Sequence, residues 1–159
     1  MISWFEDKEI GVFFDDYPRV KIRYALPSMT TLEKNAIAKY PFENKRELKV
    51  SLFDNKKYKK YEFTIRKNYC WDGASIPRMF WRLIGAKTDS KFLIPSLIHD
   101  VLCENHSYID NDREFSTKVF NALLIVSGVN KFNRFLMKNS VNFYQLFCHY
   151  LKDLYVDTA

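Results

Sequence analysis

The sequence predicts an α+β fold, with antiparallel β-hairpins in the first part of the chain and a bundle of three to four helices in the second. Short segments of alternating apolar and polar residues before residue 70 are typical of strands, whereas long apolar stretches with helical spacing follow residue 76. Strands that precede helices, instead of alternating with them, favour α+β over a parallel α/β sheet. The 159 residues are expected to form one domain, β-rich over about 1–70 and helical over about 76–155.

Four short segments carry the strand signals. Residues 11–14 and 19–24 are apolar or alternating. Residues 47–53 and 61–66 alternate on either side of the turn Asp54-Asn55-Lys56-Lys57, and together they form the clearest hairpin in the chain. Residues 26–45 break the pattern, and there Thr30 or Thr31 is predicted to cap a short helix that ends at Pro41.

Four helices are predicted in the second part. The first begins at Pro77 and ends near Gly85, and the second runs from Ser90 or Lys91 to about Glu104. The third begins after Asp110 or Asp112 and is stopped by Gly128, and the fourth covers about residues 132–154. Each has apolar residues on one face, as expected of helices that pack together.

The composition excludes several classes of protein. Aromatic residues make up 17% of the chain, with only four Gly and five Pro, which excludes disordered and fibrous proteins. No apolar run approaches the roughly 20 residues that a membrane span needs. The N-terminus is acidic and lacks a basic region followed by an apolar one, so no signal peptide is expected. These features predict a cytosolic protein whose Cys70, Cys103 and Cys148 are reduced.

A polar motif is the main functional signal. The stretch Trp71-Asp72-Gly73-Ala74-Ser75-Ile76-Pro77-Arg78 is followed, in a predicted apolar helix, by His99-Asp100. Polar side chains in such surroundings are costly to bury unless they bond to one another or to backbone. The candidate cluster consists of Asp72, Ser75, His99, Asp100 and Arg113. A structural interpretation makes it a buried clasp, in which Arg113 reaches Asp100 or Asp72 across two antiparallel helices.

Catalytic interpretations of the same residues remain open. Ser75 either caps the helix that begins at Pro77 or acts as a nucleophile with His99 as its base, although no glycine-flanked nucleophile elbow is present. Adjacent His99 and Asp100 are a metal-ligand pair in some phosphohydrolases, so a divalent metal is an alternative, with no other cofactor expected. A zinc site from Cys103, His106, Cys148 and His149 lacks a supporting CxxC pair.

The net charge of +6 raises the question of a nucleic-acid partner. The densest basic patch, interleaved with Tyr58 and Tyr61, falls on the predicted hairpin and consists of Lys56, Lys57, Lys59, Lys60, Arg66 and Lys67. Basic and aromatic residues together are typical of single-strand binders. Lysines also protect exposed hairpin edges in water, and this second explanation is favoured.

The motifs resemble those of a family of bacteriophage and prophage proteins, domain-of-unknown-function family 1353. The resemblance covers about residues 47–145, and residues 26–45 look like an insertion. It is carried by Trp71 to Arg78, Trp81, His99-Asp100, Leu102, Arg113, Phe120, Leu123 and Gly128-Val129. The chain departs from the pattern at Cys103, where the family has Tyr, at Thr117, where it usually has Asp, and at Asn142, near the family's Arg. Joint loss of an Asp and an Arg favours a structural clasp.

The resemblance implies a phage origin and supplies no activity. The main hypothesis is a non-catalytic protein, either virion-associated or a binder of a host or viral macromolecule, found in the host cytoplasm during infection or in the virion. One alternative is a small hydrolase in which Asp72, His99 and Asp100 hold a metal or transfer protons and Arg113 orients an anionic group. A second alternative is a nucleic-acid binder. A viral or host protein is the expected partner, and the oligomeric state is left open.

Overall fold

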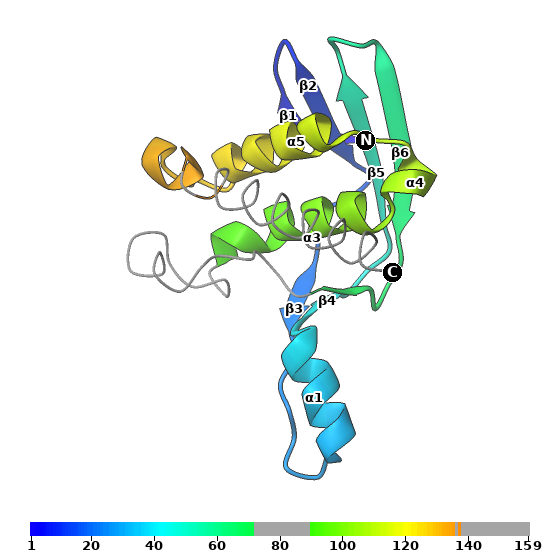
Figure 1. Ribbon diagram of the computed structural model, residues 1–159, viewed down its shortest axis with the longest axis vertical. Helices are drawn as coiled ribbons and strands as arrows, with labels where there is room; N and C mark the ends of the chain where they lie inside the picture. Colours follow the sequence, from blue (N-terminus) through cyan, green and yellow to red (C-terminus); the bar gives the residue numbers. More distant parts are fainter. Residues whose placement is uncertain (72–89, 136, 138–159) are drawn as a thin grey trace, which may run out of the picture.

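The computed structural model describes residues 1–71, 90–135 and 137 (Figure 1). Antiparallel strands occupy the first part of the chain and helices the second, which confirms the predicted α+β class. The predicted helix from Pro77 and most of the predicted final helix lie outside the described residues, although residues 131–135 are helical. No helix within the described ranges is long and apolar enough to cross a membrane.

The main sheet has four antiparallel strands in the order β1-β2-β5-β6. They are β1 (Ile2–Glu6), β2 (Ile10–Phe14), β5 (Leu48–Asp54) and β6 (Lys59–Ile65). Val12 lies opposite Leu52, which lies opposite Tyr61, so these three buried side chains form one row on the inner face. Lys49 in β5 and Glu62 in β6, which alternate with buried residues, are exposed on the outer face, as strand alternation requires.

A second, smaller sheet joins β3 (Val20–Ile22), β4 (Phe42–Asn44) and β7 (Cys70–Trp71). Asn44, which is fully buried, connects it to the main sheet. Its Nδ2 donates to the backbone oxygens of Ile65, at 3.4 Å, and Arg66, at 3.0 Å, where β6 ends. Because an amide directed at two carbonyls fixes both, this side chain ties the small sheet to the end of β6.

Three helices lie on one side of the main sheet (Figure 1): α3 (Ser90–Glu104), α4 (His106–Ile109) and α5 (Arg113–Val126). The side chain of Asp112 caps α5 by accepting from the Phe115 N–H at 2.7 Å, as one of the two predicted starts of this helix requires. Gly128, with φ of +84°, follows its end. One apolar core contains the inner side chains of the main sheet and those of α3 and α5.

The segment of residues 23–41, here called the arm, projects from the body (Figure 1). Its helix α1 (Thr31–Lys39) is capped by the Thr30 hydroxyl, which accepts from the Glu33 N–H at 3.2 Å, as predicted. Ile37 is the one buried residue of α1. The base of the arm is closed by the Arg23 N–H, which donates to the Pro41 oxygen at 2.7 Å.

Several elements differ from the sequence expectation. Strand β1 was not expected because the pairing register shifts between Ser3 and Phe5, which brings Trp4 and Phe5 both against the core and removes the alternation. The hairpin turn covers residues 55–58, and β6 begins at Lys59 instead of residue 61. Strands β4 and β7 and helix α4 have four residues or fewer and depend on pairing with distant segments.

Candidate functional site

Helix α3 presents His99 toward α5. The imidazole packs on the ring of Phe120, with centroids 5.0 Å apart and planes inclined by 54°. One turn later, the Cys103 sulfur lies 3.6 Å from His99 Nε2, as expected of residues four apart on a helix. His99 is therefore enclosed on two sides by an aromatic ring and a thiol.

The geometry of His99 and Asp100 does not form a general-base pair. His99 Nδ1 and Asp100 Oδ1 are 3.8 Å apart, which is longer than a hydrogen bond. Their side chains are only 11% and 16% exposed. Within the described ranges, no group of three or more metal-binding side chains occurs. A metal held by His99 and Asp100 would therefore need further ligands from residues such as Asp72, which lies outside those ranges.

Arg113 stands at the first position of α5, and its backbone oxygen accepts hydrogen bonds from the hydroxyls of Ser116 and Thr117 at 2.9 and 3.0 Å. Asp72, one of the two predicted partners of Arg113, lies outside the described residues. The predicted clasp from Arg113 to Asp100 or Asp72 therefore stays a prediction. Thr117 is buried, and its hydroxyl donates to the backbone oxygen of Arg113.

The polar motif begins at a buried anchor. Trp71, the last residue of β7, is fully buried, and its Nε1 donates to Ser96 Oγ at 3.0 Å. The Ser96 hydroxyl in turn donates to the Leu93 oxygen at 3.0 Å, so the indole is held by α3. The next residues of the motif, including the candidate site residues Asp72 and Ser75, lie outside the described residues.

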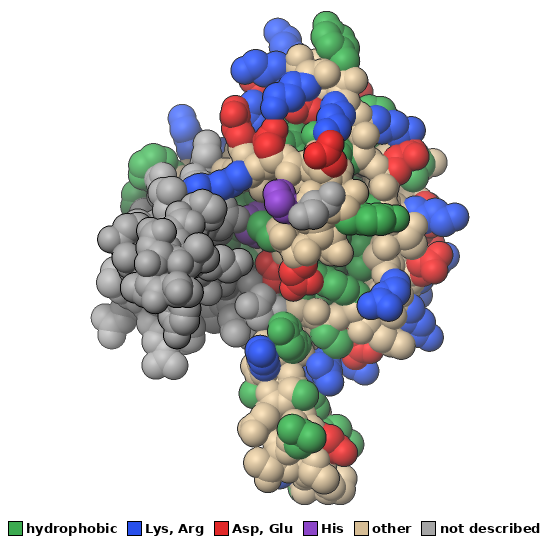
Figure 2. All heavy atoms as spheres, turned by 45° about the vertical axis from the view of Figure 1, so that its right-hand side comes forward, with side chains coloured by type: hydrophobic (Ala, Val, Ile, Leu, Met, Phe, Trp, Pro, Cys, Tyr) green, Lys and Arg blue, Asp and Glu red, His purple; other side chains and the backbone are tan. Residues whose placement is uncertain are grey.

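The basic hairpin is clamped to the start of α5 by two ion pairs. Lys57 Nζ lies 2.6 Å from Asp112 Oδ2, and Lys59 Nζ lies 2.9 Å from Asp110 Oδ2. On the outer face of the sheet, Lys60 pairs with Glu62 at 2.7 Å. Three of the six predicted nucleic-acid residues are thus already partnered by carboxylates; the other three, Lys56, Arg66 and Lys67, are exposed. Figure 2 shows positive and negative side chains intermingled over the body.

The ion pairs shift the acid–base equilibria of their members. The hydrogen bond from Lys57, followed by that of the Phe115 N–H, lowers the pKa of Asp112. The hydrogen bond from Lys59 likewise lowers the pKa of Asp110. The same bonds raise the pKa of each lysine. Lys57 and Lys59 therefore keep their charge engaged within the chain, which leaves less of it for a phosphate backbone.

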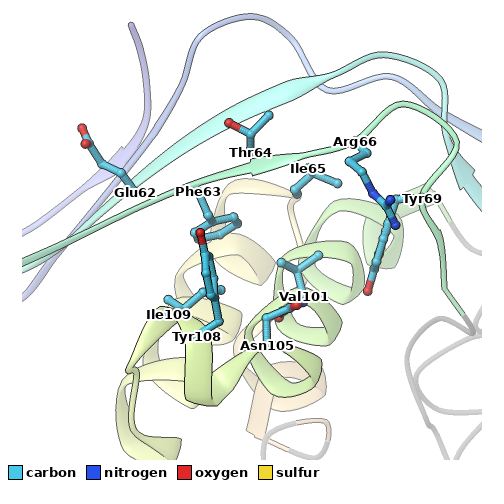
Figure 3. Close-up of a pocket in the computed structure, with 10 residues that line it drawn as sticks. All are labelled: Glu62, Phe63, Thr64, Ile65, Arg66, Tyr69, Val101, Asn105, Tyr108 and Ile109. Atoms are coloured by element: carbon cyan, nitrogen blue, oxygen red, sulfur yellow. The ribbon is translucent and has the colours of Figure 1, made fainter.

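A pocket of about 450 Å³ lies between β6 and the helices α3 and α4 (Figure 3). Phe63 and Tyr108 stand close together at one end, and Arg66 and Tyr69 stand at the other. Val101 of α3 forms the floor between them. The remaining lining residues are Glu62, Thr64, Ile65, Asn105 and Ile109.

Sequence reasoning placed His99 and Asp100 correctly on α3 but missed this pocket. The alternation of Phe63 and Ile65 indicates the inner face of a strand, so the sequence could predict this wall of the pocket. The opposite wall comes from α4, whose four residues carry no helical period, and from Tyr69 after a turn at Asn68 with φ of +71°. A pocket between segments about 40 residues apart depends on tertiary packing.

Comparisons with known proteins place the chain in a family. The model of the family DUF1353, described as proteins of unknown function, matches residues 49–141, which is more than half of the chain. The chain belongs to this family. The arm precedes the matched region. The uncharacterized protein y4jT of Sinorhizobium fredii (strain NBRC 101917 / NGR234) is 46% identical over 41 residues, 26% of this chain and 12% of that protein. No solved structure matches the chain.

Proposed function

We propose that this DUF1353 member is a non-catalytic binding protein of bacteriophage or prophage origin, whose arm docks on a host or viral protein. The observation that carries this proposal is the apolar surface of the arm. Tyr24, Leu26 and Leu32 are 74%, 56% and 81% exposed. Hydrophobic side chains are visible on the projecting arm in Figure 2. Aromatic and aliphatic residues gathered on a projecting element are typical of a docking surface.

The arm also lacks the support that would hold it in isolation. Helix α1 has nine residues, and isolated helices shorter than about 12–15 residues are only marginally stable in water. Only Ile37 of this helix is buried. A partner that covers Leu32 and Tyr24 would supply the missing apolar burial, so binding and stabilisation of the arm would occur together.

The surroundings of His99 support a structural role for the His99-Asp100 pair of the motif. His99 is packed against Phe120, and its contact with Asp100 is too long for a hydrogen bond. A general base needs a free path to a substrate proton within about 3 Å. The described surroundings of His99 resemble a packed helix–helix contact more than such a path.

The arm is tested by photocrosslinking in the native host. A photoreactive residue at position 32 is expected to trap a defined protein, and the same residue at the exposed position 8 serves as the control. The trapped protein is then purified and titrated against the wild type and the double variant Y24S/L32D. At least a tenfold weaker affinity for the variant, with an unchanged melting temperature, supports the proposal. Equal affinity of the two chains contradicts it.

The hydrolase alternative is tested by differential scanning fluorimetry with EDTA, manganese and zinc. We expect no metal response in the wild type. We expect His99→Ala to melt several degrees lower, because the imidazole fills the space beside Phe120. A wild-type chain stabilised by metal, together with a folded His99→Ala chain that loses this response, would favour the hydrolase.

A further inference from the structure

Strand β6 is an open edge of the main sheet. The strand order is β1-β2-β5-β6, and no strand within the described ranges pairs with the outer side of β6. It is seven residues long, so its outer side presents a row of backbone N–H and C=O groups. Such an edge readily pairs with another strand.

The open part of this edge is well defined. The pocket is lined by the consecutive residues Glu62 to Arg66, of which Arg66 directly follows the end of β6, so this stretch of the chain is accessible from the helix side. Toward the hairpin turn the edge is covered, because Lys59 Nζ bonds both the backbone oxygen and the carboxylate of Asp110 at 2.9 Å. Thr64 is the central residue of the open stretch.

We propose that a second copy of this chain pairs with this edge, with the two β6 strands antiparallel and centred on Thr64. The two copies are then related by a two-fold axis at Thr64, and the main sheets become continuous. This contact is isologous, because each copy offers the same surface. The proposal is independent of the arm and its partner.

Charge complementarity selects this register. With Thr64 opposite Thr64, Glu62 of each copy lies opposite Arg66 of the other, which gives two symmetric opposite-charge pairs. Centring the pair on Phe63 would place Lys60 opposite Arg66. Centring it on Glu62 would bring the two Glu62 carboxylates together, and both arrangements are repulsive. Glu62 and Arg66 are exposed in the single chain and therefore accessible to a second copy. Glu62 also pairs with Lys60 of its own strand at 2.7 Å, so Arg66 of the second copy would be its second basic neighbour.

The apolar side chains beside the pocket favour the same register. Side chains on opposite faces of a strand alternate, so Phe63 and Ile65 face the helices while Glu62 and Thr64 face outward (Figure 3). In the proposed dimer, Phe63 of one copy lies opposite Ile65 of the other, beside the pocket floored by Val101. Each copy would thus complete the pocket of the other with an apolar side chain.

The main experiment is a charge swap followed by sedimentation equilibrium over a concentration series. We expect the wild type to dimerise reversibly, and Glu62→Arg and Arg66→Glu each to raise the dimer dissociation constant by roughly tenfold or more, because both symmetric pairs become repulsive. An equimolar mixture of the two variants should form a heterodimer, since each Arg then faces a Glu. Glu6→Arg, the same change on the opposite edge strand β1, is the control and should dimerise like the wild type.

The register is tested by oxidising Thr64→Cys, which should form a covalent dimer through position 64. Lys60→Cys has no partner at position 60 and should cross-link no more than the wild type. A wild type that stays monomeric at every concentration would overturn the proposal. So would a dimer that tolerates Glu62→Arg, or a mixture of the two charge variants that fails to associate while both chains remain folded by circular dichroism.

Discussion

Helices α1 and α5 begin in the same way and are held by different means. Each is capped by a side-chain oxygen that accepts from the backbone N–H three residues later, Thr30 in α1 and Asp112 in α5. Eight of the fourteen residues of α5 are buried, whereas one of the nine in α1 is. Local signals therefore define the start of both helices, but only α5 is held by packing. The body is thus stabilised by packing, while the arm leaves its apolar side chains exposed.

The largest expected effect tests the difference between α5 and α1 directly. Leu123→Ala in α5 removes a fully buried side chain and should lower the free energy of unfolding by about 3 kcal/mol. Leu32→Ala in α1 removes an exposed one and should change it by less than about 0.5 kcal/mol. Chemical denaturation of both variants measures the difference, and similar losses in the two would contradict the division into body and arm.

Next in size is the anchor of the polar motif. Ser96→Ala removes the acceptor of the buried Trp71 indole N–H and should lower the free energy of unfolding by about 1–3 kcal/mol. Ser3→Ala, at an exposed position of β1, is the matched control and should be nearly neutral. A neutral Ser96→Ala would mean that the indole finds another acceptor.

The clamp at Asp112 has a smaller, pH-dependent effect. Asp112→Asn keeps a capping oxygen but removes the ion pair with Lys57, so the loss at neutral pH should be a few tenths of a kcal/mol. Because the folded-state pKa of Asp112 lies below its ordinary value of 3.8, the ion pair stabilises the fold above that pH and is lost as the pH falls through the folded pKa. The stability difference between the two chains should therefore shrink in acid. A difference that grows in acid would contradict this assignment.

The smallest effect on global stability is expected at the cap of the arm. Thr30→Ala removes the acceptor for the Glu33 N–H and should speed hydrogen exchange of the α1 amides roughly fivefold. The melting temperature should stay unchanged, because α1 opens without the body. If instead the melting temperature falls with the α1 exchange rate, the arm and body unfold together.

The sequence predicts elements whose signals are local. Helices α3 and α5 have long apolar faces, and Asp112 and Gly128 mark the limits of α5, so their positions were predicted closely. Strand β1 was not predictable from alternation, because the irregular pairing at Trp4 places two consecutive aromatic side chains against the core. Strands β4 and β7 exist only because each pairs with residues far along the chain.

For the candidate site, the type of element was easier to predict than the contacts. His99 and Asp100 lie on α3 as expected. The motif that contains them did not predict the distance between their side chains, which is set by their adjacent positions on the helix. Arg113 opens α5, and the pairing of α3 with α5 brings His99 against Phe120, a contact that the sequence did not predict. The lysines of the hairpin were read as a surface patch, whereas Asp110 and Asp112, about 50 residues later, engage two of them.

Asn44 gives the molecule a mechanical link between its two regions. The arm lies between β3 and β4 in the chain. The side-chain amide of Asn44 in β4 donates hydrogen bonds to two backbone oxygens where β6 ends. A pull on the arm is therefore transmitted through directional hydrogen bonds to the strand end beside Arg66. Hydrogen bonds depend on distance and angle and are lost after a small displacement, whereas apolar contacts are non-directional and tolerate a shift. Because Phe42, which directly follows the arm, lies in the core, a displacement of the arm would reach the core and the end of β6 through the same strand.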